Sequence, residues 1–266
     1  MTVIATMLAG LSSSEMTRAQ YDRSLAAQQQ SKAGDQWSYF QAKKLRSALQ
    51  HNTLDLLSAT TVIQPLDFAR LPASAGASVI AALQKSSLPE IPTAAPLAAP
   101  MQAALEAIES QKPEEKIVQL LANVTPDSLA AALTAARERS IAFDSATKPV
   151  NQSIDQLEKS VVADKSASAS FMVARLHYNS ARYDAEARLN QTIANLLELQ
   201  VRKNNISAER HHRRSSKFFY GMLAAQMAVI ISTLAIAAQK RNFLWSIAAA
   251  AGLAAVVFAV YVYLRG

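Results

Sequence analysis

The chain has 266 residues, no cysteine, and 27 lysines and arginines against 20 aspartates and glutamates, so its formal net charge is +7. The lack of cysteine excludes disulfides, thiolate metal sites and cysteine nucleophiles. Only 6 glycines and 6% aromatic residues are present, and alanine, leucine, glutamine and serine dominate, which favours long helices over sheets and predicts an all-α fold.

Residues 1–11 form an apolar N-terminal stub in which Thr2 and Thr6 are the polar side chains. As a helix the stub is about 16 Å long, roughly half a bilayer. It has no basic start and no obvious cleavage site, so a signal peptide is not expected. Two interpretations stay open: an interfacial stub, or the second half of a transmembrane helix whose start is missing from this chain.

A long helix, the signature helix, is expected over residues 12–60, with hydroxyl caps at Ser12–Ser14 and an acid at Glu15. Small or apolar residues recur along it at seven-residue spacing, which is typical of a seam against a partner helix. We expect the seam to comprise Ala19, Ala26, Ala33 and Phe40, followed by Leu45, Ala48, Leu49 and Leu56.

Residues 61–165 are expected to form a small helical cap of Pro/Ala-rich linker and short helices, because proline removes a backbone donor and clashes with the preceding turn. The helices predicted here are Ala77–Lys85, Met101–Gln111, Glu114–Asn123 and one opened by Thr125-Pro126 that reaches about Thr147. Pro149 is expected to separate the last of these from the next helix.

A coiled-coil helix with a basic juxtamembrane end is predicted over residues 166–217. Its expected core positions recur at seven: Val173, Ser180, Ala187, Ala194, Val201 and Ala208, with Leu176, Tyr183, Asn190, Leu197 and Asn204 three residues later. The two asparagines are expected to fix register. Because this helix and the signature helix have nearly equal lengths, we predict a long antiparallel coiled-coil pair. For the signature helix, the alternative to a seam against a partner helix is one amphipathic helix on a globular core.

Two apolar runs, residues 218–239 and 243–264, close the chain. Each measures about 33 Å as a helix, which matches a hydrocarbon core of about 30 Å. We therefore predict a C-terminal transmembrane helical hairpin. Small residues such as Gly221, Ala225 and Ala255 offer surfaces for close packing of its helices.

A membrane-surface basic cluster, Arg210, Arg213, Arg214 and Lys217, precedes the hairpin. With Arg265 it outnumbers Lys240 and Arg241 in the hairpin loop, so the positive-inside tendency places the soluble part in the cytoplasm. The expected location is a bacterial inner membrane, with several crossings. Nucleic-acid binding is not expected, because no aromatic platform or reader motif accompanies the positive charge.

A nine-residue signature runs from Asp35 to Lys43: Asp-Gln-Trp-Ser-Tyr-Phe-Gln-Ala-Lys. It resembles the Asp-Gln-Trp-x-aromatic-aromatic-Gln-Ala-Lys sequence of an uncharacterised bacterial membrane-protein family, a domain of unknown function with a C-terminal pair of transmembrane helices. The resemblance covers roughly residues 1–60 and 175–266. It implies membership and topology but no activity.

The signature places Trp37, Phe40 and Gln41 on one helical face. We expect this patch to dock the C-terminal long helix, with Trp37 and Gln41 supplying hydrogen bonds; a small-molecule or partner site on the same patch is the alternative. The residues assigned to helix docking are Asp35, Gln36, Trp37, Tyr39, Phe40, Gln41 and Lys43.

No catalytic, cofactor or metal motif is present in the sequence, and no enzyme activity is expected. The leading hypothesis is a membrane-anchored helical structural or interaction protein of unknown biochemical role. Its expected partners are the lipid bilayer and, through the coiled-coil helices, a second copy or another protein. The alternative is a sensor or channel-like assembly in which the coiled coil couples to the transmembrane hairpin.

Overall fold

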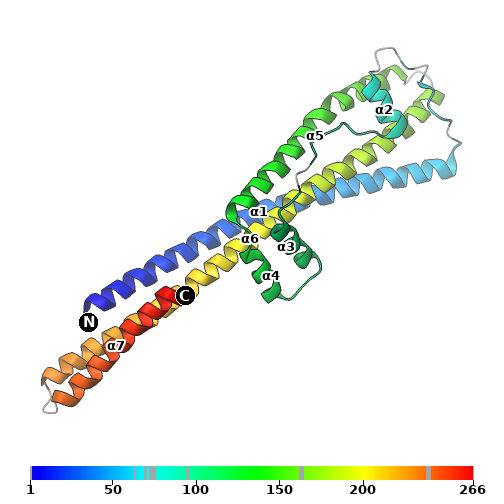
Figure 1. The fold of residues 1–266 in the computed structure, drawn as a ribbon. Coiled ribbons are helices and arrows are strands. Elements are labelled where there is room, and N and C mark those ends of the chain that lie inside the picture. The colour runs from blue at the N-terminus through cyan, green and yellow to red at the C-terminus, as the bar shows by residue number, and fades with distance from the viewer. Residues whose placement is uncertain are drawn as a thin grey trace. The chain divides into compact units, whose positions relative to one another are not determined.

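The computed structural model describes every residue except 1, 63, 69–70, 72–75, 94–95, 162–164, 238–240 and 266. Within the described residues the chain is helical and contains no strand, which confirms the all-α prediction. The elements are α1 (Thr2–Thr60), α2 (Ala77–Lys85), α3 (Ala99–Glu109), α4 (Glu114–Ala122), α5 (Pro126–Val161), α6 (Lys165–Ala237) and α7 (Arg241–Arg265), labelled in Figure 1. Two compact units divide the chain: unit 1 comprises residues 1–29 and 200–266, and unit 2 comprises residues 30–199.

Two helix boundaries differ from expectation. The predicted start at Ser12 is wrong, because α1 already begins at Thr2, so the apolar stub is the first part of the signature helix. Pro149 does not end a helix either but lies inside α5. An internal proline costs about 3 kcal/mol; buried Phe143 and Val150 anchor α5 on both sides of it and offset that cost.

The start of α5 follows its sequence signals. The backbone amide of Ser128 donates to the Thr125 hydroxyl oxygen at 3.2 Å, and Pro126 occupies the first helical position. Proline fits there because the first-turn amides have no partner within the helix. The predicted cap is therefore confirmed, although α5 extends to Val161 rather than to Thr147.

Helices α1 and α6 form a long antiparallel pair, as predicted. In unit 1 Ser12 bonds to Ser215, and in unit 2 Ser47 bonds to Ser180. Small residues fill the contact and are fully buried: Ala19, Ala26 and Ala208 in unit 1, and Ala33, Ala187 and Ala194 in unit 2. Short side chains let the two backbones approach closely, so the seven-residue seam works as expected.

Beyond Phe40 the seam departs from the prediction. Ser47 and Leu54, which continue the seven-residue spacing, are buried, whereas Leu45, Leu49 and Leu56 are more than half exposed. Of the two asparagines expected to fix the register, Asn190 donates to the backbone carbonyl of Glu186 on its own helix, and Asn204 is half-buried. The serine pairs are among the polar contacts between the helices.

The core of unit 2 joins three helices. Val79, Ala82 and Leu83 of α2 pack with Val150, Ile154 and Leu157 of α5 and with Phe171 and Tyr178 of α6. The short helix α2 thus packs against both α5 and α6 and belongs to the cap. The cap region as a whole differs from expectation, because α5 is 36 residues long and lies along α6 (Figure 1).

In unit 1 the beginning of α1 packs against the two apolar helices. Ala5 contacts Ala225 of α6 and Ala255 of α7, and Leu8 packs with Phe218 and Val262. A β-carbon added at Gly221 would lie 3.4 Å from Leu8 and 3.5 Å from Phe258, so Gly221 sits where the three helices meet. Both α6 and α7 contain a stretch long and apolar enough to cross a membrane.

Candidate functional site

Part of the signature lies at the contact of α1 with α6 in unit 2. Trp37 Nε1 donates to Glu198 Oε1 at 2.7 Å, and the Trp37 and Phe40 rings meet edge to face with centroids 5.4 Å apart. Trp37 and Phe40 are half-buried, whereas Gln41 is exposed, so a hydrogen bond to α6 comes from Trp37. Asp35 and Tyr39 are also exposed.

Lys43 makes the closest ionic contact of the signature. Its Nζ is ion-paired with Glu186 of α6, which also accepts from Arg182 at 3.0 Å. Glu186 is only 6% exposed, and a buried carboxylate needs such partners because desolvation of an unpaired charge costs several kcal/mol. Lys43 therefore neutralises a charge at the α1–α6 contact.

Three cations surround the ring of Tyr183, which the sequence analysis assigned to the coiled-coil core. Lys43 Nζ lies 5.4 Å from the ring centroid, and the guanidinium carbons of Arg46 and Arg182 lie 5.8 and 4.4 Å from it. The negative ring face attracts each cation. The half-buried Tyr183 thus orders basic side chains from two helices.

A polar cavity, here called the signature cavity, opens beside these residues. Its volume is about 650 Å³, and it lies among Gln36, Tyr39 and Lys43 of α1, Arg137 and Asp144 of α5, and Glu186 and Asn190 of α6. The side-chain oxygen of Gln36 is buried there without a hydrogen-bond partner. Signature residues and residues far along the chain thus line one cavity, which periodicity alone did not reveal.

The carboxyl group of Asp144 lines this cavity and has a raised pKa. Desolvation raises its pKa above the usual value and the nearby Glu186 carboxylate raises it further, against the opposing effect of Lys43 and Arg182. The cavity therefore disfavours a further negative charge near Asp144. Among the described residues, no three histidine or carboxylate side chains are placed to hold a metal ion.

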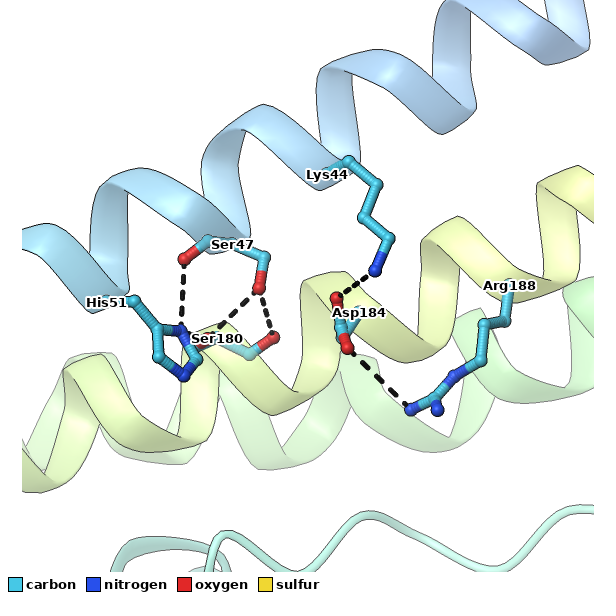
Figure 2. Close-up of polar contacts among 6 residues, drawn as sticks. All are labelled: Lys44, Ser47, His51, Ser180, Asp184 and Arg188. Atoms are coloured by element: carbon cyan, nitrogen blue, oxygen red, sulfur yellow. Dashed lines mark hydrogen bonds and ion pairs between the residues drawn. The ribbon is translucent and has the colours of Figure 1, made fainter.

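A second polar cluster lies at the α1–α6 contact. Lys44 Nζ donates to Asp184 Oδ1 at 2.8 Å, and Arg188 Nη2 lies 4.0 Å from the other carboxylate oxygen (Figure 2). The hydrogen bond from Lys44 lowers the pKa of Asp184, and the charges of Lys44 and Arg188 lower it further, although partial burial opposes them. This cluster is an ion-pair network on the rim of the helix contact.

His51 and Ser180 in the same cluster superficially resemble a nucleophile and its base. The Ser180 hydroxyl lies 2.5 Å from His51 Nδ1 and 3.1 Å from the Ser47 hydroxyl (Figure 2). Ser180 is only 1% exposed, so a substrate cannot reach its oxygen. The geometry supports a structural role, in which serine and histidine satisfy polar groups at a close helix contact.

The basic cluster of unit 1 divides into exposed and half-buried members. Arg210 and Arg213 are exposed, and Arg213 Nε donates to Glu209 at 2.9 Å, a bond that lowers the pKa of Glu209. Arg214 and Lys217 are half-buried, and Arg214 Nε has no hydrogen-bond partner. Lys240, the hairpin-loop residue used for orientation, lies outside the described residues.

Next to this cluster, acidic side chains of α1 contact His211 of α6, which the sequence analysis did not predict. Glu15 Oε2 is 2.5 Å from His211 Nδ1, and Asp22 Oδ2 is 4.0 Å from His211 Nε2. The signal was present, because Ser12 lies seven residues before Ala19, and Ser215 lies seven residues after Ala208. Extending each seam by one heptad would have placed Ser12, Ser215 and their neighbours at the contact.

Comparison with known protein families finds a match. The sequence model of a family described as a domain of unknown function (DUF4337) matches residues 1–147. The matched region includes the signature and most of the expected cap, but ends before α6 and α7. No curated protein matches the chain, and no solved structure does.

Proposed function

The chain belongs to this family of domains of unknown function, DUF4337, and we propose that it is a membrane-anchored helical protein with a structural or interaction role. In this proposal α7, the end of α6 and the beginning of α1 enter the bilayer. The antiparallel α1–α6 pair and α5 form the part outside it. The observation that carries the proposal is the distribution of residue sizes in unit 1.

Alanines are prominent among the buried residues of unit 1, and many of its large apolar side chains are exposed. Ala225, Ala228, Ala235, Ala248 and Ala255 are at most 3% exposed. The exposed large side chains include Tyr220, Met227, Ile230, Leu234, Phe243, Leu253, Val257 and Val260. A water-soluble protein rarely exposes so contiguous an apolar surface. In a bilayer this apolar surface contacts lipid tails instead of water, so its exposure carries no hydrophobic cost. Helices in lipid typically pack through small residues.

The first part of α1 shows the same arrangement, which supports placing it beside the hairpin. Ala5 and Leu8 are buried against α6 and α7, while Val3 is 72% and Met7 is 65% exposed. Between the two interpretations of the stub, this favours a segment within the bilayer. An interfacial helix lying along the membrane surface would instead turn its apolar face to lipid and its polar face to water.

We further propose that the basic cluster lies at the cytoplasmic face of a bacterial inner membrane. Arg210 and Arg213 are exposed, so anionic headgroups can approach them, at about 1 kcal/mol per residue. The half-buried Arg214 and Lys217 lie within two turns of the apolar stretch that begins at Phe218. Positive charge at this end favours retention on the cytoplasmic side.

The interaction role rests on an apolar stripe of α1 in unit 2. Leu45, Leu49 and Leu56 lie on one helical face and are 62%, 53% and 64% exposed. The α1–α6 contact and the signature cavity do not use them. We propose that this stripe contacts a second copy of the chain, with a different protein as the other outcome of the same experiments.

The absence of natural cysteine allows a direct topology test, because each introduced thiol is unique. In intact cells, a membrane-impermeant maleimide should label Asn242→Cys from outside. Ser13→Cys should be labelled only in inverted vesicles. Met227→Cys should react only after detergent is added. Recovery of the protein in the soluble fraction after carbonate extraction, or labelling of all three thiols without detergent, would refute the anchor.

The alternative, a sensor or channel-like assembly, has one observation in its favour. Helix α6 continues from Lys165 to Ala237 and includes both the α1-facing seam and an apolar stretch. A continuous helix is a rigid element through which a change at one end could bias the other. Ion flux from purified protein in liposomes, abolished by Gly221→Leu, would favour this alternative over a purely structural role.

A further inference from the structure

A second cavity of unit 2 is lined mainly by short apolar side chains, and we call it the alanine cavity. Its volume is about 660 Å³. One wall is α5, through Ala131, Ala132, Ala135, Ala136 and Ala142, and the facing walls come from the linker before α3, Met101, and Leu189 and Leu196 of α6. Alanine cannot fill the space between these elements. The volume falls in the range of about 300–1,000 Å³ typical of small-molecule sites.

Arg139 supplies a cation to this apolar cavity. It is the basic residue among the described lining residues, and its Nε is buried without a hydrogen-bond partner. Arginine stays charged at any physiological pH and presents its donors in a planar fork that matches a carboxylate. Of the other polar lining residues, Ser128 and Thr192 are neutral, and Glu138 is exposed.

From these observations we infer that the alanine cavity binds a single-chain amphiphile with an anionic head, namely a long-chain fatty acid. The hydrocarbon chain lies along the alanine wall, where it replaces missing packing contacts. The carboxylate accepts hydrogen bonds from the Arg139 guanidinium. An empty apolar cavity forfeits dispersion contacts along its lining, and a chain restores them; a charge-assisted bond to the guanidinium adds head-group selectivity.

The assignment does not depend on the proposed membrane anchor. The cavity lies wholly in unit 2, and the signature cavity is a separate space whose lining is more polar and includes two acids, Asp144 and Glu186. Leu189 lies between the two cavities and lines both. A fatty acid suits the alanine cavity, because its lining offers a long apolar surface and one buried cationic donor.

The test uses the full-length protein in nanodiscs of zwitterionic lipid and a long-chain fatty acid carrying a diazirine near its methyl end. After irradiation, mass spectrometry should locate the label on α5 and α6 residues that line the cavity. Excess unlabelled fatty acid should compete, whereas the fatty alcohol of equal length should compete about tenfold less well. A phospholipid carrying the same diazirine chain forms the parallel arm.

Three variants sharpen the test. Ala132→Trp fills the cavity and should reduce labelling there at least tenfold. Ala130→Trp is the matched control on the exposed side of the same helix and should label like the parent. Arg139→Met should weaken fatty-acid competition about tenfold while leaving alcohol competition unchanged. Circular dichroism checks that each variant is folded.

Several outcomes would overturn the inference. Equal labelling of the parent and a folded Ala132→Trp variant would show that the chain does not enter the cavity. Labelling by the phospholipid but not by the fatty acid would assign the cavity to bilayer lipid instead. If Ala132→Trp does not fold, competition in the parent protein decides, since label that unlabelled fatty acid cannot displace is nonspecific.

Discussion

Ser12 and Ser215 exchange hydrogen bonds between α1 and α6 through their backbones. The Ser12 hydroxyl donates to the Ser215 carbonyl oxygen at 3.0 Å, and the Ser215 hydroxyl donates to the Ser12 carbonyl oxygen at 2.8 Å. Both serines are nearly buried, at 8% and 2% exposure. Such reciprocal bonds require two helices whose backbones are close together, so the pair marks the register of the contact in unit 1.

Replacing either serine should weaken unit 1. Each of Ser12→Ala and Ser215→Ala should lower the free energy of unfolding by about 1 kcal/mol, the usual net value of a hydrogen bond. The double variant should lose less than the sum, because the two hydroxyl oxygens also contact each other at 3.2 Å and either single change removes that shared contact. Denaturant unfolding in detergent micelles measures this, with the exposed Ser13→Ala as control. Strict additivity would show that the two bonds are independent.

The core of unit 2 should tolerate the substitution of Tyr178 by phenylalanine. Its ring is fully buried, its hydroxyl has no hydrogen-bond partner, and burial raises its pKa. An unpaired buried hydroxyl costs about 1–3 kcal/mol. Tyr178→Phe should therefore leave the melting temperature unchanged or raise it, while Tyr178→Ala should cost about 3–5 kcal/mol by opening a cavity. Clear destabilisation by Tyr178→Phe would reveal a partner for the hydroxyl.

Asp184 should make part of the stability pH-dependent. Lys44 lowers its pKa in the folded state, so its contribution is fully present above the unfolded pKa of about 3.9 and is lost as pH falls through the lowered folded pKa. Because the pair is about one-third or more exposed, Asp184→Asn should cost less than about 1 kcal/mol at neutral pH.

That cost should shrink as the pH falls from about 4 toward the lowered folded-state pKa of Asp184, where the parent carboxylate becomes protonated. Thermal melts of parent and Asp184→Asn at neutral and acidic pH test it, with Asp55→Asn as a control for an exposed carboxylate on the same helix pair. A difference that persists unchanged at low pH would mean that packing, rather than charge, is what the substitution removes.

Gly221 should tolerate alanine but not a larger side chain. An added β-carbon meets Leu8 and Phe258 at ordinary contact distance, so Gly221→Ala should have little effect, whereas Gly221→Leu should push the first part of α1 away from α6 and α7. In a chain carrying Ala5→Cys and Ala225→Cys, a short bifunctional thiol reagent should crosslink the helices. Crosslinking should survive Gly221→Ala and fall severalfold in Gly221→Leu. Equal yields in both would place the helix contact elsewhere.

The exposed leucine stripe predicts self-association. Leu49→Glu places a charge at the centre of the stripe and should shift the protein toward the monomer in mass photometry, with no loss of helical signal. Ala48→Glu, an exposed substitution about 100° around the helix from Leu49, tests for a merely electrostatic effect. If Leu49→Glu and the parent give the same mass distribution, the stripe does not mediate self-association.

The sequence determined the helical class, the α1–α6 pairing and the apolar ends, because these depend on local propensity and on repeats that survive along one helix. The seven-residue recurrence of small side chains at Ala19, Ala26 and Ala33 predicted a close helix contact, and the similar lengths of the two long helices predicted that it is antiparallel. The Thr125-Pro126 start signal correctly predicted the helix cap at Thr125. Each of these features is encoded within a few turns of the residue concerned.

Only the tertiary structure decided where helices end and which distant residues meet. The sequence predicts a helix boundary at Pro149, yet α5 continues through it because residues on both sides are buried and anchor the helix. The sequence predicts Leu45 and Leu49 in the seam, yet both are exposed and Ser47 is the buried seam residue. The signature cavity needs Asp144 and Glu186, which lie more than a hundred residues from Gln36. No local pattern encodes such a meeting, because it depends on how α1, α5 and α6 pack together.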